Sequence, residues 1–189
     1  YSIILNCNEF NSPVNISTDN DLRLMEVIRG CHNFNAPVYI DCPESSYFFT
    51  DCPNFNAPVT LSNRTKVCYA MFRGLSNFNQ PIDLNNVQYM EEMFAYSGYN
   101  QPLHIPTNAQ FASILEQCTN YNQPDIWIKT IPTSRGQWSN AFKGAKIKHY
   151  HFPANASSSD KTYITNSFQN GSVTTFPIKA GNILFDIVD

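Results

Sequence analysis

The amino-acid sequence predicts an α/β repeat solenoid of about eight coils, with a parallel β-sheet on one face and short helices or 3₁₀ turns on the other. Three observations lead to this fold class. A pentet of two apolar residues, two mostly polar residues and a small or thiol residue returns about every 21–27 residues. A second motif, aromatic-Asn-x-Pro-aliphatic-x-aliphatic, follows the early pentets. The chain of 189 residues is also long enough for one continuous core.

The pentet is the element expected on the helical face of each coil. Its apolar residues are adjacent and usually stand three residues before a small one, which suits a short helix or a 3₁₀ turn. Eight copies run through the chain, at Ile3–Cys7, Val27–Cys31, Phe48–Cys52, Met71–Leu75, Met93–Ser97, Ile114–Cys118, Ala141–Ala145 and Ser167–Gly171.

The residues after each motif proline predict a β-strand. Apolar and polar side chains alternate there with a period of two, so that Val38 and Ile40 point inward and Tyr39 points outward. Proline is tolerated at the first position of a strand, where the loss of one ladder hydrogen bond does least harm. In the copy that starts at Tyr121 one residue is inserted after the proline, and the expected strand is 125–128.

The asparagine of the second motif recurs at one register, which predicts a hydrogen-bonded ladder along the stack. The alternative is that each asparagine is favoured independently in its own turn. The expected ladder consists of Asn11, Asn35, Asn56, Asn79, Asn100 and Asn122. The aromatic residue before the asparagine is expected to form a stacked spine in the core. That spine consists of Phe34, Phe55, Phe78, Tyr99 and Tyr121.

The repeat pattern predicts one repeat domain over residues 1–189, with regular coils in 1–130 and degenerate coils with a C-terminal cap in 131–189. Residues 155–160, rich in Ser and Asn, are expected to form a loop between the last two coils. Residues 183–188 are expected to form a final strand. Because the chain opens inside a repeat, we expect it to be a segment of a longer protein.

The degenerate pentets Ala141–Ala145 and Ser167–Gly171, each followed by a strand and a proline, are similar to the Ala-Phe-x-x-Cys unit of the BspA-like leucine-rich repeats of bacterial surface proteins. Residues 71–100 resemble a sister type of bacterial surface-protein repeat, which carries Met-Phe and Phe-Asn-Gln steps. The chain differs from that sister repeat at one position of the motif, where the chain has a proline and the sister repeat often has an acidic residue. The resemblance implies a leucine-rich-repeat-like stack that serves adhesion or recognition in bacterial, protist or phage proteins.

Composition excludes some classes of partner. Charged residues make up only 14% of the chain, below the roughly 25% typical of soluble domains. The formal net charge is −3, and no run of Lys and Arg forms a basic patch. No apolar run approaches the roughly 18 residues that would span a bilayer. We therefore expect no nucleic-acid partner and no membrane insertion by this segment.

Cysteine and histidine positions indicate packing rather than chemistry. Four of the six cysteines, Cys7, Cys31, Cys52 and Cys118, occupy the last slot of the pentet, which also accepts Leu and Ala, so we expect reduced, buried thiols there instead of disulfides. His149 and His151 share one face of a predicted strand, but no acidic or third His ligand lies near in sequence, and a plain surface strand is the favoured interpretation. No catalytic motif stands out. We expect no enzymatic activity, no metal site and no cofactor.

The outward strand positions are the remaining candidate for a binding site, because solenoids use such faces for recognition. Their aromatic, amide and acid groups suit a glycan or a protein ligand, and the alternative is a solvated β-face without a ligand. The candidate residues are Asn15, Tyr39, Thr60, Asp83, His104 and Trp127.

The sequence thus predicts a non-enzymatic recognition or adhesion module of a microbial surface or phage protein. Its expected partner is a protein or glycan on another cell or particle, and its expected location is the cell surface, the extracellular space or a virion. A structural or assembly component of a virion or surface layer is the alternative.

Overall fold

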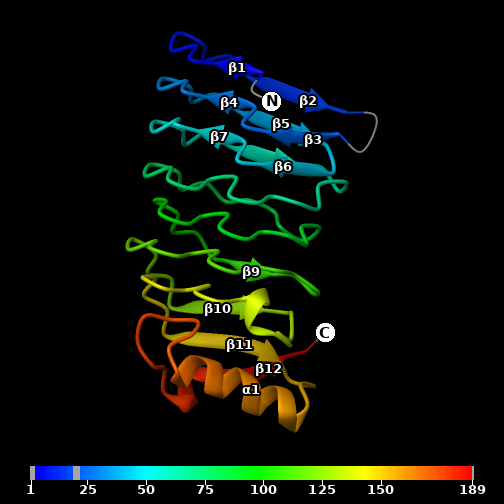
Figure 1. The fold of residues 1–189 in the computed structure, drawn as a ribbon, viewed down its shortest axis with the longest axis vertical. Coiled ribbons are helices and arrows are strands. Elements are labelled where there is room, and N and C mark those ends of the chain that lie inside the picture. Colours follow the sequence, from blue (N-terminus) through cyan, green and yellow to red (C-terminus); the bar gives the residue numbers. More distant parts are fainter. Residues whose placement is uncertain (1–2, 19–21, 189) are drawn as a thin grey trace.

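A computed structural model describes residues 3–18 and 22–188 of the chain. Residues 1, 2 and 189, the ends of the expected domain, lie outside the described part. The described chain forms a parallel-strand β-solenoid of about six turns with little helix. Figure 1 shows the coils stacked along one long axis, with the N-terminal coils at one end and α1 at the other. The parallel sheet is confirmed, whereas the expected eight coils and helical face are not.

The strands fall into four parallel sheets, each built from equivalent segments of successive coils. Two sheets share the outward row of strands described below. The first contains β2 (Val14–Ser17), β5 (Val38–Asp41) and β8 (Val59–Leu61), and the second contains β9 (His104–Ile105), β10 (Asp125–Ile128), β11 (His149–Pro153) and β12 (Ile183–Ile187). The other two contain β1 (Ile4–Leu5), β4 (Ile28–Arg29) and β7 (Phe49–Thr50), and β3 (Arg23–Met25) and β6 (Glu44–Ser46).

Seven of the eight pentets adopt short strands and turns instead of helices, whereas the last, Ser167–Gly171, begins inside the helix α1 (Ser158–Gln169). In the second coil, Glu26 and Gly30 take left-handed backbone conformations, with φ of 51° and 65°, and interrupt any right-handed helix. The pentet backbone bonds to the next coil, as where Gly30 N donates to Thr50 O at 2.9 Å. In the middle coils, turns such as Arg73 N to Ala70 O coexist with these inter-coil bonds. Hydrogen bonds along the stack therefore decide the pentet conformation.

Helical structure gathers at the C-terminal end of the stack. Among the described residues, the only α-helix is α1 (Ser158–Gln169), and the 3₁₀ helices are η1 (Arg135–Gln137) and η2 (Ala180–Asn182). The prediction of a loop over residues 155–160 is wrong for its second half. Ser157 and Asp160 form a capping box that starts α1, and Ile164 and Phe168, one turn apart, are buried. None of the described helices is long and apolar enough to cross a membrane.

Two columns of aromatic rings fill the core. The rings before the ladder asparagines stack from coil to coil, with centroids 5.6 Å apart for Phe34 and Phe55 and 5.9 Å apart for Phe55 and Phe78. A second column from the pentets lies against the first, and Phe72 stacks on Phe78 at 4.0 Å. This repeated stacking gives each coil the same apolar interface with its neighbours.

The six cysteines are free. Cys31, Cys52 and Cys118 are buried in the pentet slot, and burial raises the pKa of the Cys52 thiol to about 11. Cys7 occupies the same slot but is exposed, since it lies in the first described coil, where Ile3 and Leu5 are also 61% and 51% exposed. The expectation of burial is therefore wrong for Cys7 alone among the four.

The motif asparagines are joined along the stack. In each of the first five, the side-chain Oδ1 accepts a hydrogen bond from the backbone N–H of the equivalent asparagine one coil further on. The donor–acceptor distances are 2.7 Å for Asn35 to Asn11, 2.7 Å for Asn56 to Asn35, 2.8 Å for Asn79 to Asn56, 2.8 Å for Asn100 to Asn79 and 2.9 Å for Asn122 to Asn100. The side-chain oxygen thus serves as the hydrogen-bond acceptor at a corner of the coil where strand pairing supplies no backbone carbonyl.

Candidate functional site

The outward residues of the first sheet lie in one row. Asn15 pairs with Tyr39 and Tyr39 pairs with Thr60 across the parallel strands. All three side chains are exposed, and Tyr39 is 39% exposed. The sheet therefore presents these positions to solvent side by side.

The row continues on the second sheet as a stack of three rings. Trp127 is in register with His104 on one side and His151 on the other, despite the residue inserted after Pro124. The Trp127 ring lies 4.6 Å from the His104 ring at an interplanar angle of 8°, and 5.4 Å from the His151 ring at 16°. Both faces of the indole are covered, so only its edges face outward.

Asp83 lies between the two sheets, in a coil that is not a strand. β8 ends the first sheet and β9 ends the second. No strand of the described residues lies between β8 (Val59–Leu61) and β9 (His104–Ile105). Asp83 Oδ1 accepts a hydrogen bond from Asn85 N at 2.9 Å, a local turn that competes with strand pairing. Aspartate is also among the residues depleted in strands.

A small hollow of about 230 Å³ occupies this interruption, with Asp83 and Asn85 on one side and Pro102 and His104 on the other. The pKa of His104 is lowered, first by partial burial and then by the charge of Lys129. The imidazole is therefore neutral at pH 7. The hollow offers a carboxylate, an amide side chain and one face of a neutral aromatic ring.

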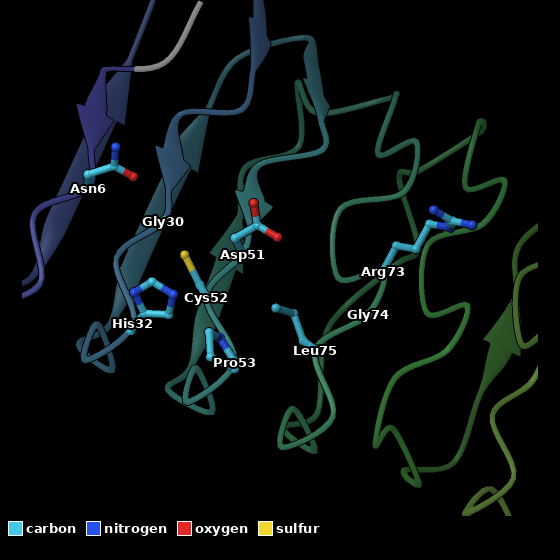
Figure 2. A pocket seen from close by; sticks show the side chains of 9 residues that line it. All are labelled: Asn6, Gly30, His32, Asp51, Cys52, Pro53, Arg73, Gly74 and Leu75. Carbon is cyan, nitrogen blue, oxygen red and sulfur yellow. The ribbon is translucent and has the colours of Figure 1, made fainter.

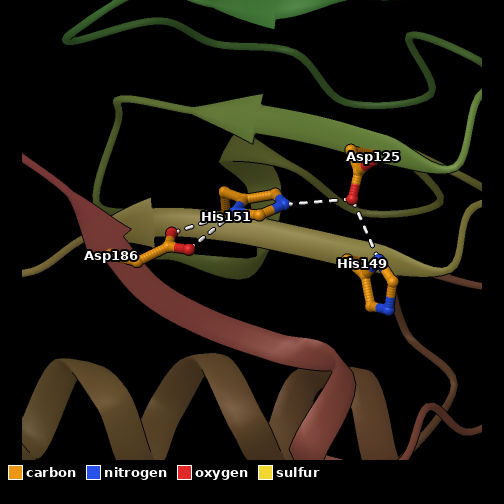
Figure 3. A network of polar contacts seen from close by, with 4 residues as sticks. All are labelled: Asp125, His149, His151 and Asp186. Atoms are coloured by element: carbon orange, nitrogen blue, oxygen red, sulfur yellow. Dashed lines mark hydrogen bonds and ion pairs between the residues drawn. The ribbon is translucent and has the colours of Figure 1, made fainter.

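Beyond the stacked rings, four side chains form a network of polar contacts (Figure 3). Asp125 Oδ1 lies 2.9 Å from His149 Nδ1 and 3.2 Å from His151 Nε2. His151 Nδ1 lies 2.9 Å from Asp186. The two histidines favour the ionised carboxylate, so the pKa of Asp125 is lowered, with the bond from His151 as the largest cause. The network joins β10, β11 and β12 at their outward face.

Sequence reasoning missed this network. Asp125 and Asp186 are 24 and 35 residues from their histidine partners. The available signal was the repeat register, which places Asp125 directly opposite His149. No group of three or more His, Cys, Asp or Glu side chains among the described residues has the arrangement of a metal site.

A second hollow lies on the pentet face, with a volume of about 380 Å³ (Figure 2). Asn6, Gly30, Asp51 and Gly74 occupy equivalent left-handed positions along it, with φ of 53°, 65°, 53° and 76°. Arg73 lines it too, but its guanidinium is paired with a carboxylate, 2.9 Å from Glu92. The hollow is lined by polar and apolar residues alike and by no pair of stacked aromatic rings, so the sheet face remains the stronger candidate site.

The fold and the outward row define a class of protein, a parallel-strand β-solenoid with a variable, aromatic-rich sheet face. The chain belongs to the family described as "Mycoplasma protein of unknown function, DUF285", which matches residues 43–151, more than half of the chain. No curated protein and no solved structure matches the chain significantly.

Proposed function

We propose that the chain is a non-enzymatic recognition or adhesion module that binds a protein or glycan through its outward sheet face. The observation that carries the proposal is the row of outward side chains from the exposed Tyr39 and Thr60 to the His104–Trp127–His151 stack. Inward positions are fixed by packing, whereas the outward ones are free to vary with the ligand. The proposal includes no catalytic step and no cofactor.

The resemblance to BspA-like leucine-rich repeats supports a finer proposal. We place the module on the surface of a microbial cell or on a phage particle, facing another cell or particle. The membership of a Mycoplasma family is compatible with the bacterial setting and adds nothing about a ligand.

The test uses the labelled chain against a broad glycan array and a displayed peptide library. The sheet-face variant Tyr39→Ala/Trp127→Ala should lose the hits of the wild-type chain. Tyr89→Ala is the matched control, because Tyr89 is 45% exposed and lies in a different column of bridges, between Val67 and Gln110. Hits that survive the double substitution, or that vanish equally in Tyr89→Ala, would refute binding through the sheet face.

An assembly role is the second candidate, and one observation favours it. Within the described part of the chain, β1 and β2 each have a strand neighbour on one side only, and the apolar side chains Ile3 and Leu5 beside this edge are exposed. Such an edge can pair with further β-structure of the same or another chain. Light scattering should then show concentration-dependent association that Leu5→Lys abolishes. A strictly monomeric wild-type chain would count against this role.

A further inference from the structure

The coil that carries Asp83 has backbone groups without partners. No backbone hydrogen bond joins the described residues Ile82–Leu84 to β8 or to β9, and Leu84 O alone accepts a local bond, from Val87 N. Every other coil of the outward row from β2 to β12 is paired with a neighbour. The N–H groups of this segment and two of its carbonyls are therefore available to another molecule.

These groups border the hollow of about 230 Å³ described above. The opposite wall is His104, whose one face is covered by Trp127. Its other face is turned toward the preceding coil, since Trp127 of the following coil covers the first face, and the preceding coil supplies Ile82–Asn85 to the lining. A planar aromatic face thus lies opposite a carboxylate and free backbone groups. Small ligand sites typically combine such an apolar surface with a few convergent polar groups.

Charge selects among the ligands that fit. Asp83 supplies one negative charge, and its Oδ1 is already engaged by Asn85 N. On the other side, Lys129 is close enough to lower the pKa of His104. The opposite charges of Asp83 and Lys129 offset one another at the hollow, so it favours an uncharged ligand. Hydroxyl groups suit it best, since each can both donate to Asp83 and accept from a backbone N–H.

We propose that the hollow between Asp83 and His104 binds one uncharged sugar ring of a glycan. The ring lies against the free face of His104, and its hydroxyls bond Asp83 and the backbone of Ile82–Leu84. This inference rests on the proposed recognition function and names its ligand class. The ring that stacks on the sugar is then His104, at the open end of the ring stack, and not Trp127, whose two faces are covered.

The test is an NMR titration of the ¹⁵N-labelled chain with neutral hexoses and N-acetylhexosamines. Binding should shift the amides of residues 82–84 and the His104 ring signals, with dissociation constants near the millimolar level. Asp83→Ala and His104→Ala should each weaken binding at least about tenfold. Tyr89→Ala is the matched control, because Tyr89 is exposed outside the outward row and does not line the hollow. Circular dichroism checks that each variant is folded.

Two results would overturn the inference. One is the absence of shifts with every sugar up to about 10 mM. The other is equal or tighter binding of Nα-acetyl-lysine amide, which would make the ligand a cationic side chain.

The array experiment separates this inference from the proposed function. Hits that are lost in Tyr39→Ala/Trp127→Ala but kept in Asp83→Ala would leave the recognition face standing and remove the sugar from the hollow. Hits that neither variant affects would refute both the recognition function of the sheet face and the sugar site in the hollow.

Discussion

Substitution of Asn79 by leucine tests whether the asparagine ladder stabilises the stack. In the wild-type chain Asn79 Oδ1 accepts from Asn100 N at 2.8 Å and from Gln101 Nε2 at 3.2 Å. Gln101 Nε2 keeps a second acceptor, Asn79 O at 3.0 Å, so the loss falls on the Asn100 N–H. That group is in a half-buried residue and would have no protein partner.

An unsatisfied buried donor costs about 1–3 kcal/mol, and we expect a loss of about 2 kcal/mol for Asn79→Leu. For a chain of this length that loss lowers the melting temperature by roughly 4–8 °C. Urea denaturation and differential scanning calorimetry measure the two quantities.

Two matched variants sharpen the test. Asn79→Asp keeps the acceptor oxygen and should stay within about 1 kcal/mol of the wild-type chain. Asn122 is the last member of the ladder, and its Oδ1 accepts only from the Asn100 side chain. Asn122→Leu leaves no backbone donor without a partner and should cost less than Asn79→Leu. An unchanged melting temperature in Asn79→Leu, or equal losses at both positions, would show that each asparagine merely suits its own turn.

Three further outcomes follow from particular contacts. In a urea titration, Gly98→Ala should destabilise the chain by at least about 1 kcal/mol, because the new Cβ would collide with the carbonyl of Ser76. The control Gly136→Ala should be near neutral, because a Cβ at Gly136 meets open space. At neutral pH, Asp125→Asn should be less stable than the wild-type chain, as measured by urea midpoints. Because the folded pKa of Asp125 lies below the ordinary 3.8, the difference in stability between the two chains should shrink as the pH falls through and below about 4. The amides of Ile82–Leu84 should exchange with solvent faster than those of β10, and equal protection would contradict the interruption of the sheet.

The sequence was sufficient for the features that repeat. The period, the inward side chains and the positions of the ladder asparagines depend on local patterns that recur in each coil, so alignment of the copies reveals them. Tyr39, Thr60, His104 and Trp127 take outward positions for the same reason. Their role in binding stays a prediction.

The features that depend on contacts between coils were not predictable in the same way. The pentets looked helical because adjacent apolar pairs suit a helix as well as a short strand, and bonds such as Gly30 N to Thr50 O decide between them. Helix α1 was not predicted because the Ser-rich stretch at its start resembles a loop, although Ser157 and Asp160 have the spacing of a capping box. The Asp125 network requires the strand register across an inserted residue.

The interruption at Asp83 is compatible with a stable stack because other parts of that coil remain fixed. Asn79 keeps its place in the ladder, and Phe78 stacks between Phe55 and Tyr99 at 5.9 Å and 6.3 Å. The unpaired backbone groups border an open hollow and can bond to water, so the missing sheet bonds cost far less than they would in the core. The coil can therefore give up sheet pairing on its outer face while its aromatic ring and asparagine hold it in register. A binding hollow at this position needs no change in the residues that build the solenoid, only an outward residue such as Asp83 that prefers a turn to a strand.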